Sequence, residues 1–218
     1  MKRFTAPLFY FISFIVFTLL VKTVDLQPAG AEGTLIGFAN LNLSVQQLFG
    51  QNHLSYKITQ IFGILALITA AVFAITGIVQ MFKRKSLLKV DSDILLLGLI
   101  YLLLVILYIL FEKLAINYRP VVLDEGLEPS YPSTHTMLIL TVFGTCMRIS
   151  RSFISSKKLQ SAIIIFCLVI MELTVVFRMI CGVHWFTDII GGVLISFCLI
   201  TLYNSLINFT LFLSKKKL

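Results

Sequence analysis

Long apolar stretches separated by short polar segments make up most of the sequence. A helix that crosses a bilayer needs about 20 apolar residues, with a range of about 17–25. Six stretches fit this length, at residues 5–21, 58–82, 94–111, 135–154, 159–180 and 189–212. The pattern therefore predicts an all-α integral membrane bundle of six transmembrane helices.

The first stretch follows Met1-Lys2-Arg3, an arrangement that secretory signal peptides also have. It is long for the apolar core of a signal peptide, and no A-x-A-type cleavage site follows it before Lys22. We therefore expect a retained helix. In the long connection over residues 22–57, the second half fits either a short helix in the membrane interface or an irregular loop.

The composition excludes a soluble domain. Hydrophobic residues make up 58% of the chain and charged residues 13%, whereas soluble domains have about 45–50% apolar and about 25% charged residues. The length of 218 residues allows one compact bundle, and no linker or internal repeat divides it. We expect a single membrane domain over residues 1–218.

The net charge of +8 is explained by membrane topology. With a cytoplasmic N-terminus, 13 of the 18 Lys and Arg residues lie on or near the cytoplasmic side, in agreement with the positive-inside rule. Both termini are then cytoplasmic, and no nucleic-acid partner is needed to account for the charge. The 13 residues are Lys2, Arg3, Lys83, Arg84, Lys85, Lys89, Arg148, Arg151, Lys157, Lys158, Lys215, Lys216 and Lys217.

Three polar segments fall together on the extracytoplasmic side of this topology. They cover residues 113–120 after the third stretch, residues 131–135 at the start of the fourth, and residues 178–188 between the fifth and the sixth. Two predicted helices begin there, so their N-termini direct positive dipole ends to the same place. We expect the three segments to form one site.

The cations in these segments suit a phosphate group, which carries about −1.5 to −2 at neutral pH. Arg119 and Arg178 can bind phosphate oxygens through two nitrogens at once, whereas Lys113 acts as a point charge. Ser133 adds a hydroxyl donor. These residues predict an anion-binding pocket.

Two of the three histidines in the chain lie in the same segments. His184 and Asp188 are four residues apart, so the carboxylate can reach one ring nitrogen, fix the tautomer and leave the other nitrogen free for attack. Attack on phosphorus would give a phosphohistidine. His135 could then protonate the leaving oxygen and later activate water.

No carboxylate cluster suited to Mg²⁺ accompanies these groups. Asp124, Glu125 and Glu128 form only a loose acidic loop, and no two cysteines form a C-x-x-C pair. Cations around the phosphoryl oxygens would stabilise the charge that metal ions stabilise in other phosphotransferases. We therefore expect no metal ion and no other cofactor.

The three segments resemble the signature of the type-2 phosphatidic acid phosphatase superfamily, written K-x6-R-P, P-S-G-H and S-R-x5-H-x3-D. Here they read Lys113…Arg119-Pro120, Pro132-Ser133-Thr134-His135 and Phe177-Arg178…His184…Asp188. The resemblance covers residues 112–192 closely and the N-terminal third only in general layout. The six-helix layout is also that of this family.

The resemblance implies an enzyme, a membrane lipid phosphatase that acts on a lipid phosphate or diphosphate at the extracytoplasmic side. Undecaprenyl diphosphate, phosphatidylglycerophosphate and phosphatidate are the candidate substrates. It implies that His184 is the nucleophile, that Asp188 orients it and that His135 is the acid/base. Phosphate would be bound by Lys113, Arg119, Ser133 and Arg178.

Two positions depart from the family pattern. Thr134 replaces the usual Gly, which tightens the pocket or adds a hydroxyl to the phosphate-binding set. Phe177 replaces the Ser before Arg178 and removes one phosphate donor. Neither change affects a histidine, so activity is still expected.

Other functions fit the segments less well. A lipid phosphotransferase using the same intermediate is the nearest alternative. An intramembrane serine protease would need an activated serine, usually in a G-x-S-type setting, but Ser133 lies between Pro132 and Thr134. A transporter usually has helices broken by Gly or Pro in mid-span, and no predicted span has a Pro near its middle. A binding protein would not require the histidines. The oligomeric state is left open.

Three further residues have more than one interpretation. Trp185 and Tyr131 could hold a lipid near its head group or anchor the chain in an aromatic belt. Glu172, near the middle of the fifth stretch, could support a proton path or brace Arg178, or it could form a structural hydrogen bond.

Overall fold

A computed structural model describes residues 2–122 and 126–216 of the chain. Asp124, Glu125 and Lys217 lie outside the described residues. The described chain is all-helical, with two isolated β-bridges and no strand. The α-helices are α1 (Thr5–Val21), α2 (Ala39–Phe49), α3 (His53–Arg84), α4 (Ser92–Leu114), α5 (Thr134–Phe153), α6 (Lys157–Ile180) and α7 (Phe186–Lys216).

A long helix forms at each of the six predicted stretches. Four of them, α3, α4, α6 and α7, are long and apolar enough to cross a membrane, and α1 is a shorter apolar helix. The chain is therefore a multi-pass membrane protein. Among the described residues α5 does not meet the same criterion, and its second half carries Arg148 and Arg151. The count of six spans remains a prediction.

The ends of the helices follow local capping chemistry. Asn52 caps α3 by accepting a hydrogen bond from the Ser55 amide at 2.9 Å, so α3 begins five residues before the predicted stretch. Of the two alternatives for the preceding loop, a short helix is present, because α2 covers Ala39–Phe49.

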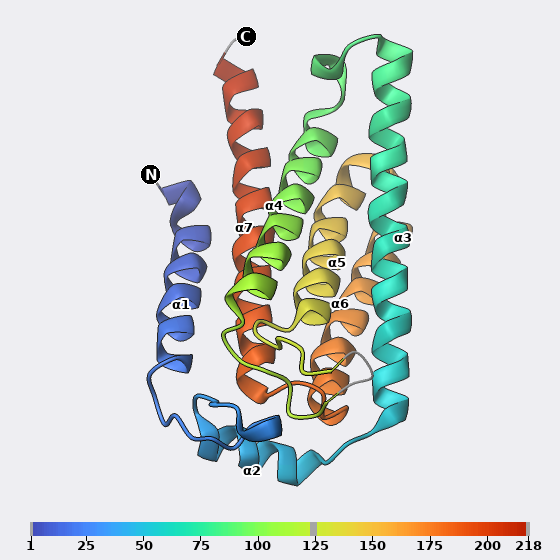
Figure 1. Cartoon of the computed structure of the whole chain (residues 1–218). Coiled ribbons are helices and arrows are strands. Elements are labelled where there is room, and N and C mark those ends of the chain that lie inside the picture. Colours follow the sequence, from blue (N-terminus) through green and yellow to red (C-terminus); the bar gives the residue numbers. More distant parts are fainter. Residues whose placement is uncertain (1, 123–125, 217–218) are drawn as a thin grey trace.

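The core lies around α7, which packs against α1, α4 and α5 (Figure 1). Of the residues in the most hydrophobic stretch of α7, 56% are buried, against 11% in the corresponding stretch of α3. The outward side chains of α3 are mostly apolar, as expected for a helix that faces lipid. The bundle thus has a packed centre and an apolar outer surface.

The two ends of the chain lie at one end of the bundle, and the three polar segments lie at the other (Figure 1). The connection between α4 and α5, the loop before α7, and α2 all gather at this second end. Backbone contacts link the segments directly, because the Ser133 amide donates to the Asp188 carbonyl at 2.9 Å. The expected meeting of the three segments is therefore observed.

The structure excludes some of the interpretations given above for three side chains. Trp185 and Tyr131 are each 2% exposed, so neither is an aromatic-belt anchor or a lipid contact. The Trp185 indole donates to the Tyr118 carbonyl, and the Tyr131 hydroxyl pairs with Thr18, which explains their inward direction. Glu172 is exposed on α6 and has no described contact with Arg178, six residues later on another face of the helix.

Candidate active site

The connection between α4 and α5 is held by a short antiparallel backbone pairing. The Arg119 amide donates to the Glu128 carbonyl at 3.0 Å, and the Ser130 amide donates to the Asn117 carbonyl at 2.8 Å. The bond between Tyr131 and Pro132 is cis, and the chain then enters α5. This pairing places the Arg119 side chain and the Ser130 carbonyl on the site.

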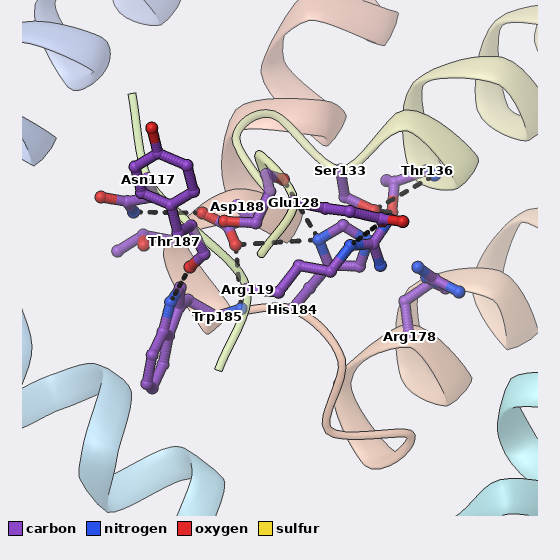
Figure 2. A network of polar contacts seen from close by, with 12 residues as sticks. Asn117, Arg119, Glu128, Ser133, Thr136, Arg178, His184, Trp185, Thr187 and Asp188 are labelled. Carbon is purple, nitrogen blue, oxygen red and sulfur yellow. Dashed lines mark hydrogen bonds and ion pairs between the residues drawn. The ribbon is translucent and has the colours of Figure 1, made fainter. Parts of the chain in front are cut away.

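Ser133 is the N-cap of α5 and is fully buried. Its hydroxyl oxygen accepts from the Thr136 amide at 3.5 Å and from the Thr136 hydroxyl at 3.0 Å (Figure 2). Because these bonds use only the oxygen, the hydroxyl proton of Ser133 remains available to a ligand. Capping and ligand binding are thus compatible at this residue.

The loop from α6 to α7 depends on Gly182. Its φ of +70° is one that side-chain-bearing residues rarely adopt, and an added Cβ would lie 2.6 Å from the Gly50 carbonyl oxygen. This close approach fixes the loop against the end of α2 and directs His184 into the bundle. His184 is 5% exposed as a result.

The His184 ring has one occupied and one unoccupied nitrogen. Nδ1 lies 3.1 Å from the Ser130 carbonyl oxygen, which can only accept, so Nδ1 carries the proton in neutral histidine. Nε2 is buried and has no partner among the described residues. Burial lowers the pKa of His184 well below its usual value, and the charges of Arg178 and Arg119 lower it further. The resulting species is a neutral imidazole with a free Nε2 lone pair.

Asp188 lies beside His184 but does not accept its main hydrogen bond. Its Oδ2 is 3.7 Å from His184 Nδ1 and accepts from the Trp185 amide at 2.9 Å, while Oδ1 accepts from Asn117 at 3.2 Å. The expected direct hydrogen bond is thus replaced by the Ser130 carbonyl, because the carboxylate oxygens already cap α7 and bind Asn117. The Asp188 carboxyl nevertheless remains beside Nδ1 (Figure 2).

Arg178 is fully buried, and no carboxylate forms an ion pair with it among the described residues. Its Nη1 donates to the Thr59 hydroxyl at 3.2 Å, and its guanidinium lies 5.8 Å from the centre of the Tyr56 ring. Nε and Nη2 have no described partner. Such a group is suited to binding an anion, because the free-energy cost of removing it from water has already been incurred when the chain folds.

Arg119 and Glu128 form an ion pair, with 2.8 Å between Nε and Oε2. Their side chains are 13% and 25% exposed, so the pair lies at the edge of the site. The sequence had placed Glu128 in a loose acidic loop, whereas it is in fact the partner of a predicted phosphate ligand. A phosphate that binds Arg119 would therefore compete with or share this carboxylate.

His135, the second residue of α5, contacts α3 through its ring. Its Nε2 lies 2.7 Å from Gln60 Oε1, and its Nδ1 is buried without a described partner. Arg178, Arg119 and His184 are close enough to interact with it electrostatically. His135 thus belongs to the same cluster as His184.

Lys113 and Thr134 are not part of this cluster in the described contacts. Lys113 is exposed in the last turn of α4, and five residues separate it from Arg119, one fewer than in the K-x6-R-P pattern. Thr134 is half-buried and lines an apolar groove beside α4. The structure therefore brings together His184, Asp188, His135, Arg119, Ser133 and Arg178.

Five residues that contact the site residues are not predicted by the sequence. Ser130 acts through its backbone carbonyl, which no side-chain motif reveals. The other four lie outside the motif positions and act through polar or aromatic contacts, namely Asn117, Tyr56, Thr59 and Gln60. The three α3 residues share one helix face, and only this spacing could have singled them out.

Comparisons with known proteins give the fold and the family of this chain. The crystal structure of the first transmembrane PAP2 type phosphatidylglycerolphosphate phosphatase, from Bacillus subtilis, matches with a TM-score of 0.65 at 21% identity. The match covers 91% of this chain and 94% of that chain, and it shows a shared fold. A search of curated proteins gave no match. The sequence profile of the PAP2 superfamily matches residues 100–211, about half of the chain, and this chain belongs to that superfamily.

Proposed function

We propose that this protein is a lipid phosphatase that forms a covalent phosphohistidine on His184. The observation that carries the proposal is the pairing of a neutral His184, with its Nε2 free, and a buried Arg178 that has no carboxylate partner among the described residues. A nucleophile and an anion-binding cation in one buried cluster are what phosphoryl transfer requires. Membership of the PAP2 superfamily supports the same activity.

The reaction has two steps. The Nε2 lone pair of His184 forms a bond to phosphorus while the bond between phosphorus and the lipid oxygen breaks. His135, which would be an imidazolium when the anionic phosphate is bound, gives one of its two ring protons to that oxygen and becomes neutral. Water then attacks phosphorus, gives a proton to His135 and displaces His184 as inorganic phosphate leaves. Both histidines are restored at the end of the cycle.

The cations and donors stabilise charge on the transferring group. Arg178 and Arg119 would bind the phosphoryl oxygens, with the Ser133 hydroxyl as a third donor. Asp188 would stabilise the imidazolium that develops on His184. We propose that this set makes a metal ion unnecessary. Lys113 would attract the lipid phosphate from outside the cluster, and Thr134 would contact the substrate from the groove.

The substrate tail has an apolar path to the cluster. A groove of about 380 Å³ is lined by Leu67 of α3, by Leu104 and Tyr108 of α4, and by Thr134, His135 and Leu138 of α5. Since His135 lines this groove and interacts electrostatically with His184, a lipid chain in the groove would bring its ester oxygen to His135. Phosphatidylglycerophosphate, undecaprenyl diphosphate and phosphatidate are the substrates proposed for testing.

The proposal includes a topology. The single domain over residues 1–218 would cross the membrane six times, with both termini in the cytoplasm and the site on the extracytoplasmic side. The distribution of basic residues and the position of both chain ends opposite the site support this arrangement (Figure 1). The lipid tail would stay in the outer leaflet while its phosphate is removed.

The test is phosphate release by purified protein in detergent from the three lipids, with EDTA present. We expect release by the wild type and a loss of at least about a thousandfold in His184→Ala, because the nucleophile is absent. Equal release by both proteins would contradict the proposal. Phosphate release only when a second lipid alcohol is added would instead favour the phosphotransferase.

A further inference from the structure

One face of α3 lies against the site, although none of its residues belongs to the three motif segments. Tyr56, Thr59, Gln60 and Gly63 follow a spacing of three, four and seven residues, which places them on one side of a helix. Thr59 accepts the hydrogen bond from Arg178, and the Tyr56 ring lies beside the same guanidinium. The third polar residue of this face, Gln60, contacts His135.

The contact between Gln60 and His135 fixes the direction of the imidazole ring. Gln60 Oε1 lies 2.7 Å from His135 Nε2. The same edge of the ring faces Gly63, because a Cβ at that glycine would lie 3.3 Å from Cδ2 and 3.5 Å from Nε2. Nδ1 is on the opposite edge of the ring, so it points away from α3 and has no described partner.

We propose that Gln60 is a positioning residue for His135: it keeps one proton on Nε2 throughout the cycle, so that Nδ1 gives the second proton of the imidazolium to the leaving oxygen and later takes one back from water. A carboxamide oxygen can only accept, so it selects the neutral tautomer that carries hydrogen on Nε2. The inference rests on the proposed function in one respect, namely that His135 is the acid/base. The tautomer itself does not depend on that function.

The charges around His135 explain why a neutral partner suits this position. Among the described residues, Arg178 of α6, Arg119 of the loop after α4 and His184 of the loop before α7 interact electrostatically with the ring, and Tyr108 of α4 lines the same groove. A carboxylate in place of Gln60 would add a negative charge next to the phosphate site, and it would hold His135 protonated at the second step, when the ring must be neutral to accept a proton from water. The amide orients the ring without either effect.

The first test reads the tautomer without turnover. The chain has three histidines, so protein with isotope-labelled histidine gives few ring-nitrogen signals, and His135→Gln identifies those of His135. We expect a protonated Nε2 in the wild type and a shift to mixed or Nδ1-protonated tautomers in Gln60→Met. Gln47→Met, at an exposed position of α2, is the matched control and should keep the wild-type signals. Identical His135 signals in the wild type and Gln60→Met would overturn the inference.

The second test reads proton transfer. In Gln60→Met we expect kcat to fall about tenfold to a hundredfold with a smaller change in KM, by analogy with the loss seen when groups that orient metal-bound histidines are removed. In Gln60→Glu the basic limb of the pH–rate profile should move up by about one pH unit or more, because a carboxylate favours the protonated ring. Gln47→Glu should leave the profile unchanged.

The outcomes separate the inference from the proposed function. If the wild type and His184→Ala release phosphate equally, the proposed function fails, while the tautomer measurement still decides the role of Gln60. If His184→Ala is inactive and Gln60→Glu keeps the wild-type pH profile, the function stands and the positioning role of Gln60 is overturned. A loss of kcat in Gln60→Glu that is equal at every pH, with no shift of the pH–rate profile, would also overturn the positioning role.

Discussion

A buried guanidinium without a carboxylate partner is the most informative single residue of this protein. Removing a cation from water costs several kcal/mol unless a counter-charge is present. Arg178 is fully buried, and its described partners are one hydroxyl and one aromatic ring. A residue of this kind weakens the fold in the absence of a ligand and strengthens anion binding. Such a cost is typical of functional sites.

Arg178→Met should therefore separate stability from activity. We expect kcat/KM to fall at least about a hundredfold, because the forked donor to phosphate is lost. The melting temperature should stay equal or rise, since the uncompensated charge is removed and the volume is nearly kept. Arg178→Lys is the control that keeps the charge without the fork. A substantially lower melting temperature in Arg178→Met would contradict this account of Arg178.

His184 should make stability depend on pH. Burial lowers the pKa of His184 in the folded protein, whereas an unfolded histidine has a pKa of about 6.5. Below that pH the unfolded state binds a proton that the folded state does not, so the free energy of unfolding decreases as the pH falls. The melting temperature of the wild type should thus drop relative to His184→Gln between pH 7.5 and pH 5. Parallel curves for the two proteins would refute this.

At the scale of the helices, the length of the apolar stretches predicted where helices form, but it did not predict which polar residues face the interior of the bundle. Each of the six stretches became a helix, because a run of this length must satisfy its backbone internally in lipid. The polar face of α3 went unnoticed, since Gln60 in an apolar stretch looks like an isolated polar residue. The Ser130 carbonyl was also out of reach, because any residue type supplies one.

The loop between α6 and α7 should tolerate no side chain at Gly182. Gly182→Ala needs an unfavourable φ of +70° and brings Cβ to 2.6 Å from the Gly50 carbonyl, so we expect a loss of about 1–3 kcal/mol in stability. Activity should fall with it, because the loop carries His184. Gly98→Ala in α4, where an added Cβ meets no atom within 4 Å, should be neutral. Thermal melts and phosphate release compare the two variants, and equal behaviour would exclude a special role for Gly182.

For the whole molecule, the sequence predicted the class and the grouping of the site better than its contacts. The three segments meet at the end of the bundle opposite the chain ends (Figure 1), as periodicity and charge had indicated. Lys113 lies outside the cluster because the end of α4 leaves it exposed. Asp188 is close to His184, but its carboxylate accepts the hydrogen bond of the Trp185 amide at the start of α7, which residue spacing alone does not reveal.

The proposed topology assigns each end of the bundle to one face of the membrane. Lys113 and Lys157 are both exposed and lie on α4 and α6, near opposite ends of the bundle. A membrane-impermeant maleimide added to intact cells should label Lys113→Cys and leave Lys157→Cys unlabelled until the membrane is broken. The unmodified protein, whose four cysteines are buried or half-buried, is the background control. The reverse labelling would invert the topology.

The central claim is that His184 becomes covalently phosphorylated. The most direct measurement is to mix wild type, His135→Ala and His184→Ala with a lipid diphosphate whose terminal phosphorus is radiolabelled, and to quench each mixture in base. A phosphate leaving group needs little protonation, so His135→Ala should accumulate label through slow hydrolysis. We predict a base-stable, acid-labile label on the peptide containing His184, strongest in His135→Ala and absent from His184→Ala. Phosphate release by the wild type with the label absent from His184 in both the wild type and His135→Ala would contradict the account.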